Sequence, residues 1–258
     1  MRILDLSRLV PGPYATELLA EQGHEVVKIE EPGRGDPMRE LSPAIFARLN
    51  RRKKFVSLDL KSEKSIFLKL ARRADVVVES FSAGVADKLG VGARAVRRVN
   101  RRIVYCSITG YGSKNPAPGH DINFLARAGL LDGREPRVLW AAVVAGLTAA
   151  LRILAAKPGE RLDLSIQDCA NSVGFARVPP IPGYGLFPAK DGRLVSVALV
   201  EKRFRDALGP GDVAALIRAR TADEWDAQTE LPISADRKAP DLAPPRLPKI
   251  GRDNSKFK

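Results

Sequence analysis

Cysteine and histidine are scarce in this sequence. Its 258 residues include two cysteines, Cys106 and Cys169, and two histidines, His24 and His120. Two widely separated cysteines cannot build the disulfide framework of a small secreted protein, and no CxxC pair or zinc-type Cys/His spacing is present. We therefore expect no structural metal site.

Long apolar runs are also missing. The longest uncharged apolar stretch, residues 138–151, is shorter than the roughly 20 residues that a bilayer-spanning helix needs. The sequence opens on a strand-like run at residues 3–6, without the basic and apolar regions of a signal peptide. These features predict a cytoplasmic protein that makes no use of the membrane.

Basic residues outnumber acidic ones by a wide margin. The formal net charge is +13 and the isoelectric point is about 10.0. Such a surface attracts polyanions, and both nucleic acid and phosphate-bearing small molecules qualify. The basic residues are spread along the chain without the interleaved aromatic side chains of a base-stacking surface. A nucleic-acid binder is thus a hypothesis that rests on charge alone, and we do not favour it.

Apolar strand-like runs alternate with helical spacing through the first two thirds of the chain. This rhythm predicts parallel strands joined by helices, because a strand–helix–strand unit in so few residues requires a crossover connection. We therefore expect an α/β protein with a Rossmann-like parallel sheet domain. The expected strands are residues 3–6, 25–30, 55–60, 75–79, 103–109 and 161–166, and the expected helices are residues 15–23, 62–73 with Ser62 as N-cap, 83–88, 93–99 and 139–156.

The composition of the sequence changes at residues 177–186, where three prolines and two glycines predict a linker. Beyond it, a turn at Asp191-Gly192 predicts a hairpin, and residues 201–208 and 213–220 have helical spacing. We therefore predict a large domain at 1–175 and a second small α+β domain at 176–233. Residues 234–258 should form a tail that returns to the large domain.

His120 is the candidate catalytic residue that the residues alone suggest. It is followed by Asp121 and Asn123 in a loop after an expected strand, where open α/β sheets place their functional groups. Histidine is a residue type suited to proton transfer, although a lone histidine is more often a hydrogen-bonded structural residue. The glycines near the strand ends do not form GxGxxG, so a dinucleotide site is not supported.

Several motifs together resemble family III CoA transferases of the CaiB/BaiF type. The resemblance is nearly continuous over residues 1–130 and is strongest in ILDLSRLVPGPYATELLAEQGHEVVKIEE (residues 3–31), PGRGD (32–36), SLDLK (57–61), ESF (79–81) and TGYG (109–112). It implies an acyl-CoA ligand that is a substrate rather than a cofactor, and an interlocked homodimer. By the same matches, the residues expected to bind CoA are Leu58, Asp59, Lys61, Ser80, Phe81 and Lys88.

Within that family, the segment GHDINF (residues 119–124) is similar to the 2-methylacyl-CoA racemase branch. The similarity implies that His120 moves the proton α to the thioester and that Glu201 helps to orient it. It also implies that Gly119, Asp121 and Asn123 contact or support the substrate.

The sequence lacks one catalytic residue of the family. Racemases and transferases of the family carry an aspartate before the helix expected at residues 139–156, where it serves as second acid or base in racemases and as nucleophile in transferases. This chain has LWAAVVAG at residues 139–146, so Ala141 and Ala142 stand where a carboxylate is expected. Asp132 or Glu135 from the nearby loop could be recruited, or water could reprotonate the substrate.

We therefore predict an acyl-CoA enzyme of lipid metabolism that transfers an α-proton with His120 as base. The alternatives are CoA transfer between an acyl-CoA and a carboxylic acid, and a catalytically inactive protein that binds CoA esters.

Overall fold

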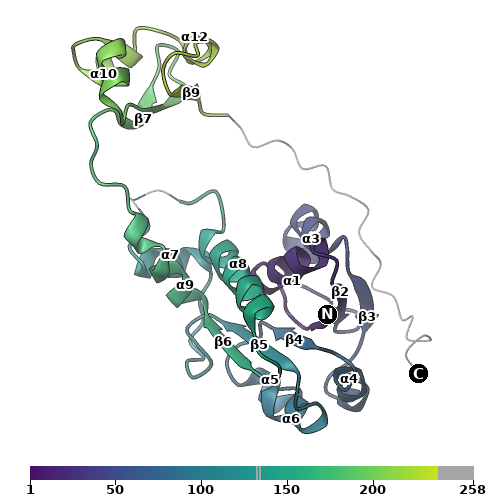
Figure 1. Ribbon diagram of the computed structural model, residues 1–258. Helices are drawn as coiled ribbons and strands as arrows, with labels where there is room; N and C mark the ends of the chain where they lie inside the picture. Colours follow the sequence, from purple (N-terminus) through teal and green to yellow (C-terminus); the bar gives the residue numbers. More distant parts are fainter. Residues whose placement is uncertain (132, 134, 238–258) are drawn as a thin grey trace. The chain divides into compact units, whose positions relative to one another are not determined.

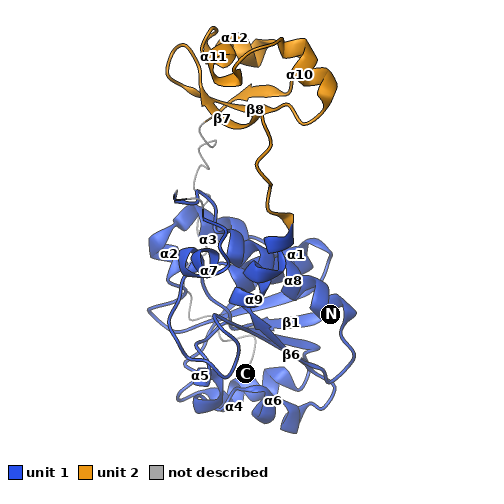
Figure 2. Cartoon of the chain, turned by 90° about the vertical axis from the view of Figure 1, so that its left-hand side faces the viewer, with its two compact units in different colours: residues 1–175, 242–258 blue, residues 176–241 orange. Residues whose placement is uncertain are grey.

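The computed structural model describes residues 1–131, 133 and 135–237. The predicted tail at 234–258 falls almost wholly outside the described residues, as does Asp132. The described chain divides into two compact units, one ending at Phe175 and the other beginning at Ala176 (Figure 2).

A parallel sheet forms the centre of the first unit (Figure 1). Within the described residues it has six strands in the order β3-β2-β1-β4-β5-β6, and neighbouring strands pair in parallel. The predicted Rossmann-like α/β class is therefore confirmed. The strands are β1 (Arg2–Asp5), β2 (Glu25–Glu30), β3 (Lys54–Ser57), β4 (Val76–Glu79), β5 (Val104–Thr109) and β6 (Arg161–Ser165).

Helices cover both faces of this sheet. α1 and α8 pack over one face against Ile3, Val78 and Cys106, while α4, α5 and α6 pack over the other against Leu4 and Val77. Burial on both faces explains why the strands read as continuous apolar runs such as Val76-Val77-Val78. The helices of this unit are α1 (Pro11–Glu21), α2 (Met38–Leu41), α3 (Pro43–Asn50), α4 (Lys64–Ala71), α5 (Val85–Lys88), α6 (Ala93–Val99), α7 (Asp121–Arg127), α8 (Trp140–Ala155) and α9 (Ile166–Ser172).

The close approach of α8 to α1 depends on Gly146. A Cβ atom at this position would lie 2.7 Å from the carbonyl oxygen of Pro11 and 2.9 Å from the ring of Tyr14. Glycine is therefore required where the two helices cross.

The strand order creates a switch point between β1 and β4. The chain proceeds from β1 outward to β2 and β3, then returns to β4 and proceeds the other way to β5 and β6. In open α/β sheets, ligands bind in the crevice beyond the carboxyl ends of the strands at such a point. The segment after β4 carries Ser80 and Phe81, two of the predicted CoA-binding residues, and the segment after β1 carries Arg8. All three residues therefore lie at the switch point.

The second unit has its own sheet and core. β7 (Tyr184–Pro188) pairs antiparallel with β8 (Leu194–Ala198), as the predicted hairpin requires, and β8 pairs antiparallel with β9 (Ile233–Ala235). Its core gathers Val195, Val197 and Trp225, whose indole N–H donates to the carbonyl of Ile217 at 2.9 Å. The helices are α10 (Lys202–Leu208), α11 (Val213–Ile217) and α12 (Ala222–Ala227), and a short 3-10 helix, Gly174–Ala176, precedes the unit.

Two local predictions were wrong or incomplete. Ser62 is not the N-cap of α4, which begins at Lys64; its hydroxyl instead donates to Asp59 Oδ2 at 2.7 Å. Helices α2, α3, α7 and α12 were not predicted, and α7 places Asp121 and Asn123 in a helix rather than in the expected loop. The start of α3 is marked by Ser42, which accepts the Ile45 N–H, and by Pro43 in the first turn.

None of the helices in the described part of the chain combines the length and apolar character that a bilayer span requires.

Candidate active site

Two cavities lie at the carboxyl edge of the parallel sheet. One, of about 230 Å³, is lined by the loop after β3, including Leu58, Asp59 and Lys61. The other, of about 480 Å³, is lined by Gly119, His120 and Asp121, among others. Both cavities include Arg8 and Phe81 in their lining, so they adjoin at this pair. The Arg8 guanidinium lies 5.1 Å from the centre of the Phe81 ring.

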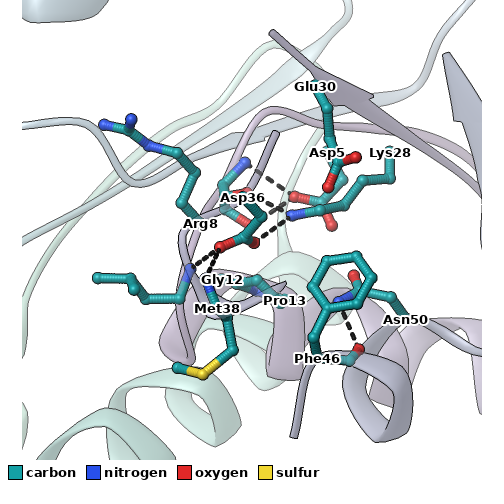
Figure 3. Close-up of polar contacts among 12 residues, drawn as sticks. Asp5, Arg8, Gly12, Pro13, Lys28, Glu30, Asp36, Met38, Phe46 and Asn50 are labelled. Carbon is teal, nitrogen blue, oxygen red and sulfur yellow. Dashed lines mark hydrogen bonds and ion pairs between the residues drawn. The ribbon is translucent and has the colours of Figure 1, made fainter. Parts of the chain in front are cut away.

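The loop that carries Arg8 is held by a buried charge network (Figure 3). Lys28 and Asp36 form an ion pair at 2.9 Å, and both side chains are fully buried. Lys28 also donates to the carbonyl of Ser7 at 2.6 Å, and Asp36 Oδ1 accepts the Leu9 N–H at 3.0 Å. Leu9 has a φ of +64°, a conformation that a non-glycine residue adopts only where its surroundings impose it. The network therefore fixes the backbone, while the Arg8 side chain points away from it.

A second buried pair lies beneath the same loop. Lys53 Nζ contacts Asp5 Oδ2 at 3.0 Å and also donates to the carbonyl of Pro13 at 2.9 Å. Burial lowers the pKa of Lys53 to about 8, against the opposing effect of Asp5. Burial acts to raise the pKa of Asp5, but Lys53 and Lys28 outweigh it and hold that pKa well below its usual range. Both pairs tie β1, β2 and the β3 region to the loop.

The predicted CoA-binding residues differ in how the structure uses them. Asp59 accepts the Lys61 N–H at 2.9 Å, and the Ser62 hydroxyl and this N–H lower its pKa. Leu58 is buried in the core and forms part of the cavity floor. Lys61 is exposed at the rim.

Ser80 and Lys88 are placed differently. The Ser80 hydroxyl accepts the Arg8 N–H at 2.8 Å and donates to the Arg8 carbonyl at 3.2 Å, so it holds the loop. Lys88 is exposed on α5 and lies outside the lining of both cavities, whereas Val85 and Leu89 of the same segment line the smaller one.

His120 stands at the N-terminus of α7 and is exposed. Its backbone N–H donates to Asn123 Oδ1 at 2.9 Å, so Asn123 fixes the turn that carries the imidazole. A Cβ atom on Gly119 would lie 2.8 Å from the Tyr111 hydroxyl and 2.9 Å from the Phe124 ring, so a larger residue before His120 would require these side chains to shift. The three predicted residues Gly119, His120 and Asn123 are therefore brought together by the start of α7.

Asp121 occupies a position that the sequence did not reveal. Its Oδ1 accepts the Ala142 N–H at 2.8 Å, in the first turn of α8. Its Oδ2 is buried and has no hydrogen-bond partner among the described residues. Burial raises the pKa of Asp121, against the lowering effect of the N–H groups of Ala142 and Ala141. A carboxyl group thus lies beside the two alanines that stand where the family's aspartate is expected.

Glu201 belongs to the second unit, where it immediately precedes α10 and is exposed. Its pairing with His120 stays a prediction. The described residues contain no group of three or more His, Cys, Asp or Glu side chains arranged to hold a metal ion.

The family model for CoA-transferase family III matches residues 1–161. The chain belongs to this family. It is 35% identical over 153 residues to the acetyl-CoA:oxalate CoA-transferase of Acetobacter aceti, a match that covers 53% of this chain and 39% of that protein. It is 36% identical over 143 residues to the succinyl-CoA:glutarate CoA-transferase of Mus musculus, over 51% of this chain and 33% of that one.

The fold is also similar to that of solved proteins. The crystal structure of the hypothetical protein Rv3272 from Mycobacterium tuberculosis matches with a TM-score of 0.73 and 26% identity, over 87% of this chain and 78% of that one. The matched part of this chain spans about two fifths or less of the length of the first curated relatives.

Proposed function

We propose that this chain binds a CoA thioester along the two adjoining cavities and transfers the proton on the carbon α to the thioester. The observation that carries this proposal is that His120 and Asp121 line the same 480 Å³ cavity at the carboxyl edge of the sheet. An imidazole and a carboxyl group in one cavity are the components of acid–base catalysis.

The smaller cavity suits the CoA moiety. Its lining offers the basic side chains of Arg8, Arg34 and Lys61 for phosphate groups. Leu58, Phe81 and Leu89 add apolar surface for the uncharged parts of CoA. Because the two cavities share Arg8 and Phe81, a ligand whose CoA moiety occupies the smaller cavity can extend its thioester end into the cavity that contains His120.

In the proposed reaction, the His120 imidazole accepts the α-proton and an enolate forms on the thioester. Asp121 in its protonated form returns a proton to the α carbon, and solvent restores both groups. The raised pKa of Asp121 favours the protonated form that this step needs. Each positioned acid or base contributes about 10² to 10⁴ in rate.

The test follows deuterium uptake at the α carbon of a chiral 2-methylacyl-CoA in deuterated water by mass spectrometry. The wild type should take up label, and His120→Gln should lose at least about 10²-fold of that rate. His24→Gln is the matched control, because the only other histidine lies at the N-terminal end of β2 and contacts the Met1 amino group at 3.2 Å. No uptake by the wild type, or uptake unchanged in His120→Gln, would refute the proposal.

The second candidate is CoA transfer, which is supported by the activities for which the two relatives are named. An Asp121 oxygen would attack the thioester carbonyl and expel CoA thiolate, which leaves a mixed anhydride. The thiolate would then attack the Asp121 carbonyl carbon, release the donor acid and leave an Asp121–CoA thioester. The acceptor carboxylate would displace the thiolate to form a second mixed anhydride, and attack of the thiolate on the acceptor's acyl carbon would release the new acyl-CoA and leave one acceptor oxygen on Asp121. With an oxygen-18-labelled acceptor acid, the Asp121 peptide should then gain label. Binding of CoA esters with neither label transfer nor deuterium uptake would leave a binding protein.

We include in this proposal an interlocked homodimer and a role for Glu201 in orienting His120, because the resemblance to the family implies both. Sedimentation velocity should give a dimer, and Glu201→Gln should slow deuterium uptake without weakening binding of the CoA ester. A monomer with full activity would remove both from the proposal.

A further inference from the structure

Arg8 holds a position between the two cavities that no other basic residue of the described chain shares. It is the one lysine or arginine among the described residues that line the cavity of His120. Arg34 and Lys61 line the smaller cavity alone, whereas Arg8 lines both. Arg8 and Phe81 are the two residues that the linings have in common, so a ligand that extends from one cavity into the other passes Arg8.

The Arg8 guanidinium has no counter-charge in the part of the chain that the structure describes. It lies 5.1 Å from the centre of the Phe81 ring and forms no ion pair with a described carboxyl group. An aromatic ring orients a guanidinium over its face without neutralising the charge. The positive charge and the N–H donors of Arg8 are therefore open to an anion at the boundary of the two cavities.

Side chains fix the main chain on both sides of Arg8. Lys28 donates to the carbonyl group before Arg8 at 2.6 Å, and Asp36 accepts the N–H after it at 3.0 Å. The N–H and carbonyl of Arg8 itself contact the Ser80 hydroxyl at 2.8 and 3.2 Å. Both peptide groups that flank the Arg8 Cα atom are thus held, while its side chain extends away from Lys28 and Asp36 (Figure 3). A donor mounted in this way is preorganised for a charge that develops during a reaction.

We propose that Arg8 is a further catalytic residue, whose guanidinium donates a hydrogen bond to the thioester oxygen and stabilises the enolate. When the α C–H bond breaks, the proton goes to His120 and the electron pair moves onto that oxygen, where negative charge develops. Arg8 exchanges no proton in this step, and the electron pair returns to the α carbon when Asp121 gives up its proton. The inference rests on the proposed function for the reaction and adds the group that stabilises its intermediate.

A guanidinium at this boundary can also contact a phosphate group in the smaller cavity, as Arg34 and Lys61 can. The two uses of Arg8 differ in what a neutral side chain would change. Loss of a phosphate contact weakens the binding of CoA with or without an acyl group, whereas loss of an enolate contact leaves the binding of free CoA unchanged. Arg8→Met makes this comparison without disturbing the loop, because the contacts with Lys28, Asp36 and Ser80 involve main-chain atoms.

Acetoacetyl-CoA tests the inference without turnover, because its acyl group ionises to an enolate whose ultraviolet absorbance can be followed directly. The ratio of enolate to neutral ester should rise at least about tenfold on binding to the wild type, since a hydrogen bond to a charged group is worth about that factor or more. Arg8→Met should lose this rise and bind free CoA with unchanged affinity in calorimetry. Arg8→Lys, which keeps the charge without the planar fork, should retain part of the rise.

The rate of deuterium uptake provides a second readout. With a saturating chiral 2-methylacyl-CoA, Arg8→Met should slow uptake by about 10²- to 10³-fold, the loss typical of removing one oxyanion donor. The matched control is Arg97→Met, because Arg97 is an exposed arginine on α6 that lines neither cavity. It removes one positive charge and should leave both the enolate ratio and the uptake rate unchanged.

An enolate ratio that survives in Arg8→Met would overturn the inference. An equal loss of affinity for free CoA and acetoacetyl-CoA would also overturn it and assign Arg8 to a phosphate group. Deuterium uptake by the wild type would in either case leave the proposed α-proton transfer standing. An enolate ratio that depends on Arg8, without deuterium uptake by the wild type, would refute the proton transfer and retain the contact of Arg8 with the thioester oxygen. Failure to bind either ester would overturn both proposals.

Discussion

Breaking the buried ion pair between Lys28 and Asp36 should be costly. The two charges are 2.9 Å apart and neither side chain is exposed. Asp36→Asn keeps an oxygen that can accept the N–H groups of Leu9 and Met38, both at 3.0 Å, but leaves the Lys28 ammonium without its counter-charge. Removing one partner of a buried pair costs about 3–5 kcal/mol. We therefore expect the free energy of unfolding of the first unit to fall by that amount.

Urea titration with hydrogen exchange of the β1 and β2 peptides measures this change in the first unit alone. Glu25→Gln is the control, because its ion pairs with Arg2 and Lys54 are exposed and should contribute less than about 1 kcal/mol. Replacing both charges, with Lys28→Met and Asp36→Leu, should destabilise less than Asp36→Asn. A loss below about 1 kcal/mol in Asp36→Asn would refute the reasoning.

Three further outcomes are expected. Gly146→Ala should lower stability by about 1–3 kcal/mol, since its Cβ would meet Pro11 and Tyr14, whereas Gly174→Ala, with no atom within 4 Å, should change the urea midpoint little. The Glu79 carboxyl has a raised pKa in the folded state, so its contribution to stability is present below its unfolded pKa and is lost as pH rises. The free energy of unfolding of Glu79→Gln should therefore increase relative to that of the wild type as pH rises above 4.5. A difference between the two proteins that stays constant across pH would contradict this. Asp121→Asn should keep the hydrogen bond from Ala142 and the melting temperature, yet slow deuterium uptake by about 10² or more; uptake at the wild-type rate would remove Asp121 from the proposed reaction.

The sheet was predictable because parallel strands buried on both faces leave a readable pattern. Val76-Val77-Val78 and Ile3-Leu4 are apolar in consecutive positions, which is what two covered faces require. Helix ends were less certain. The Ser62 hydroxyl could either cap the following helix or form a hydrogen bond within the turn after β3. It donates to Asp59 in that turn, a contact that does not depend on the helix.

The buried charges could not be identified from the sequence. Asp36 stands in the glycine-rich loop PGRGD and Lys53 in a basic run, both of which are typical of exposed segments. Asp36 is enclosed by the loop after β1, where it accepts the Leu9 N–H, whereas Lys53 is enclosed by the first turn of α1, where it donates to the carbonyl of Pro13. Linear composition carries no information on that enclosure.

The same limit applies to the missing carboxylate. Asp132 and Glu135 are the carboxylates nearest to Ala141 and Ala142 along the chain, and the sequence therefore favours them as substitutes. The carboxyl group that reaches this place belongs to Asp121, which is 21 residues before Ala142 and meets it because α7 and α8 begin side by side. Asp121 was identified through its motif, but only as a substrate contact. Its unpaired Oδ2 gives it a chemical capacity that neither the motif nor the spacing implied. A chain that lacks the family's aspartate in sequence can therefore still present a carboxyl group to the cavity that contains His120.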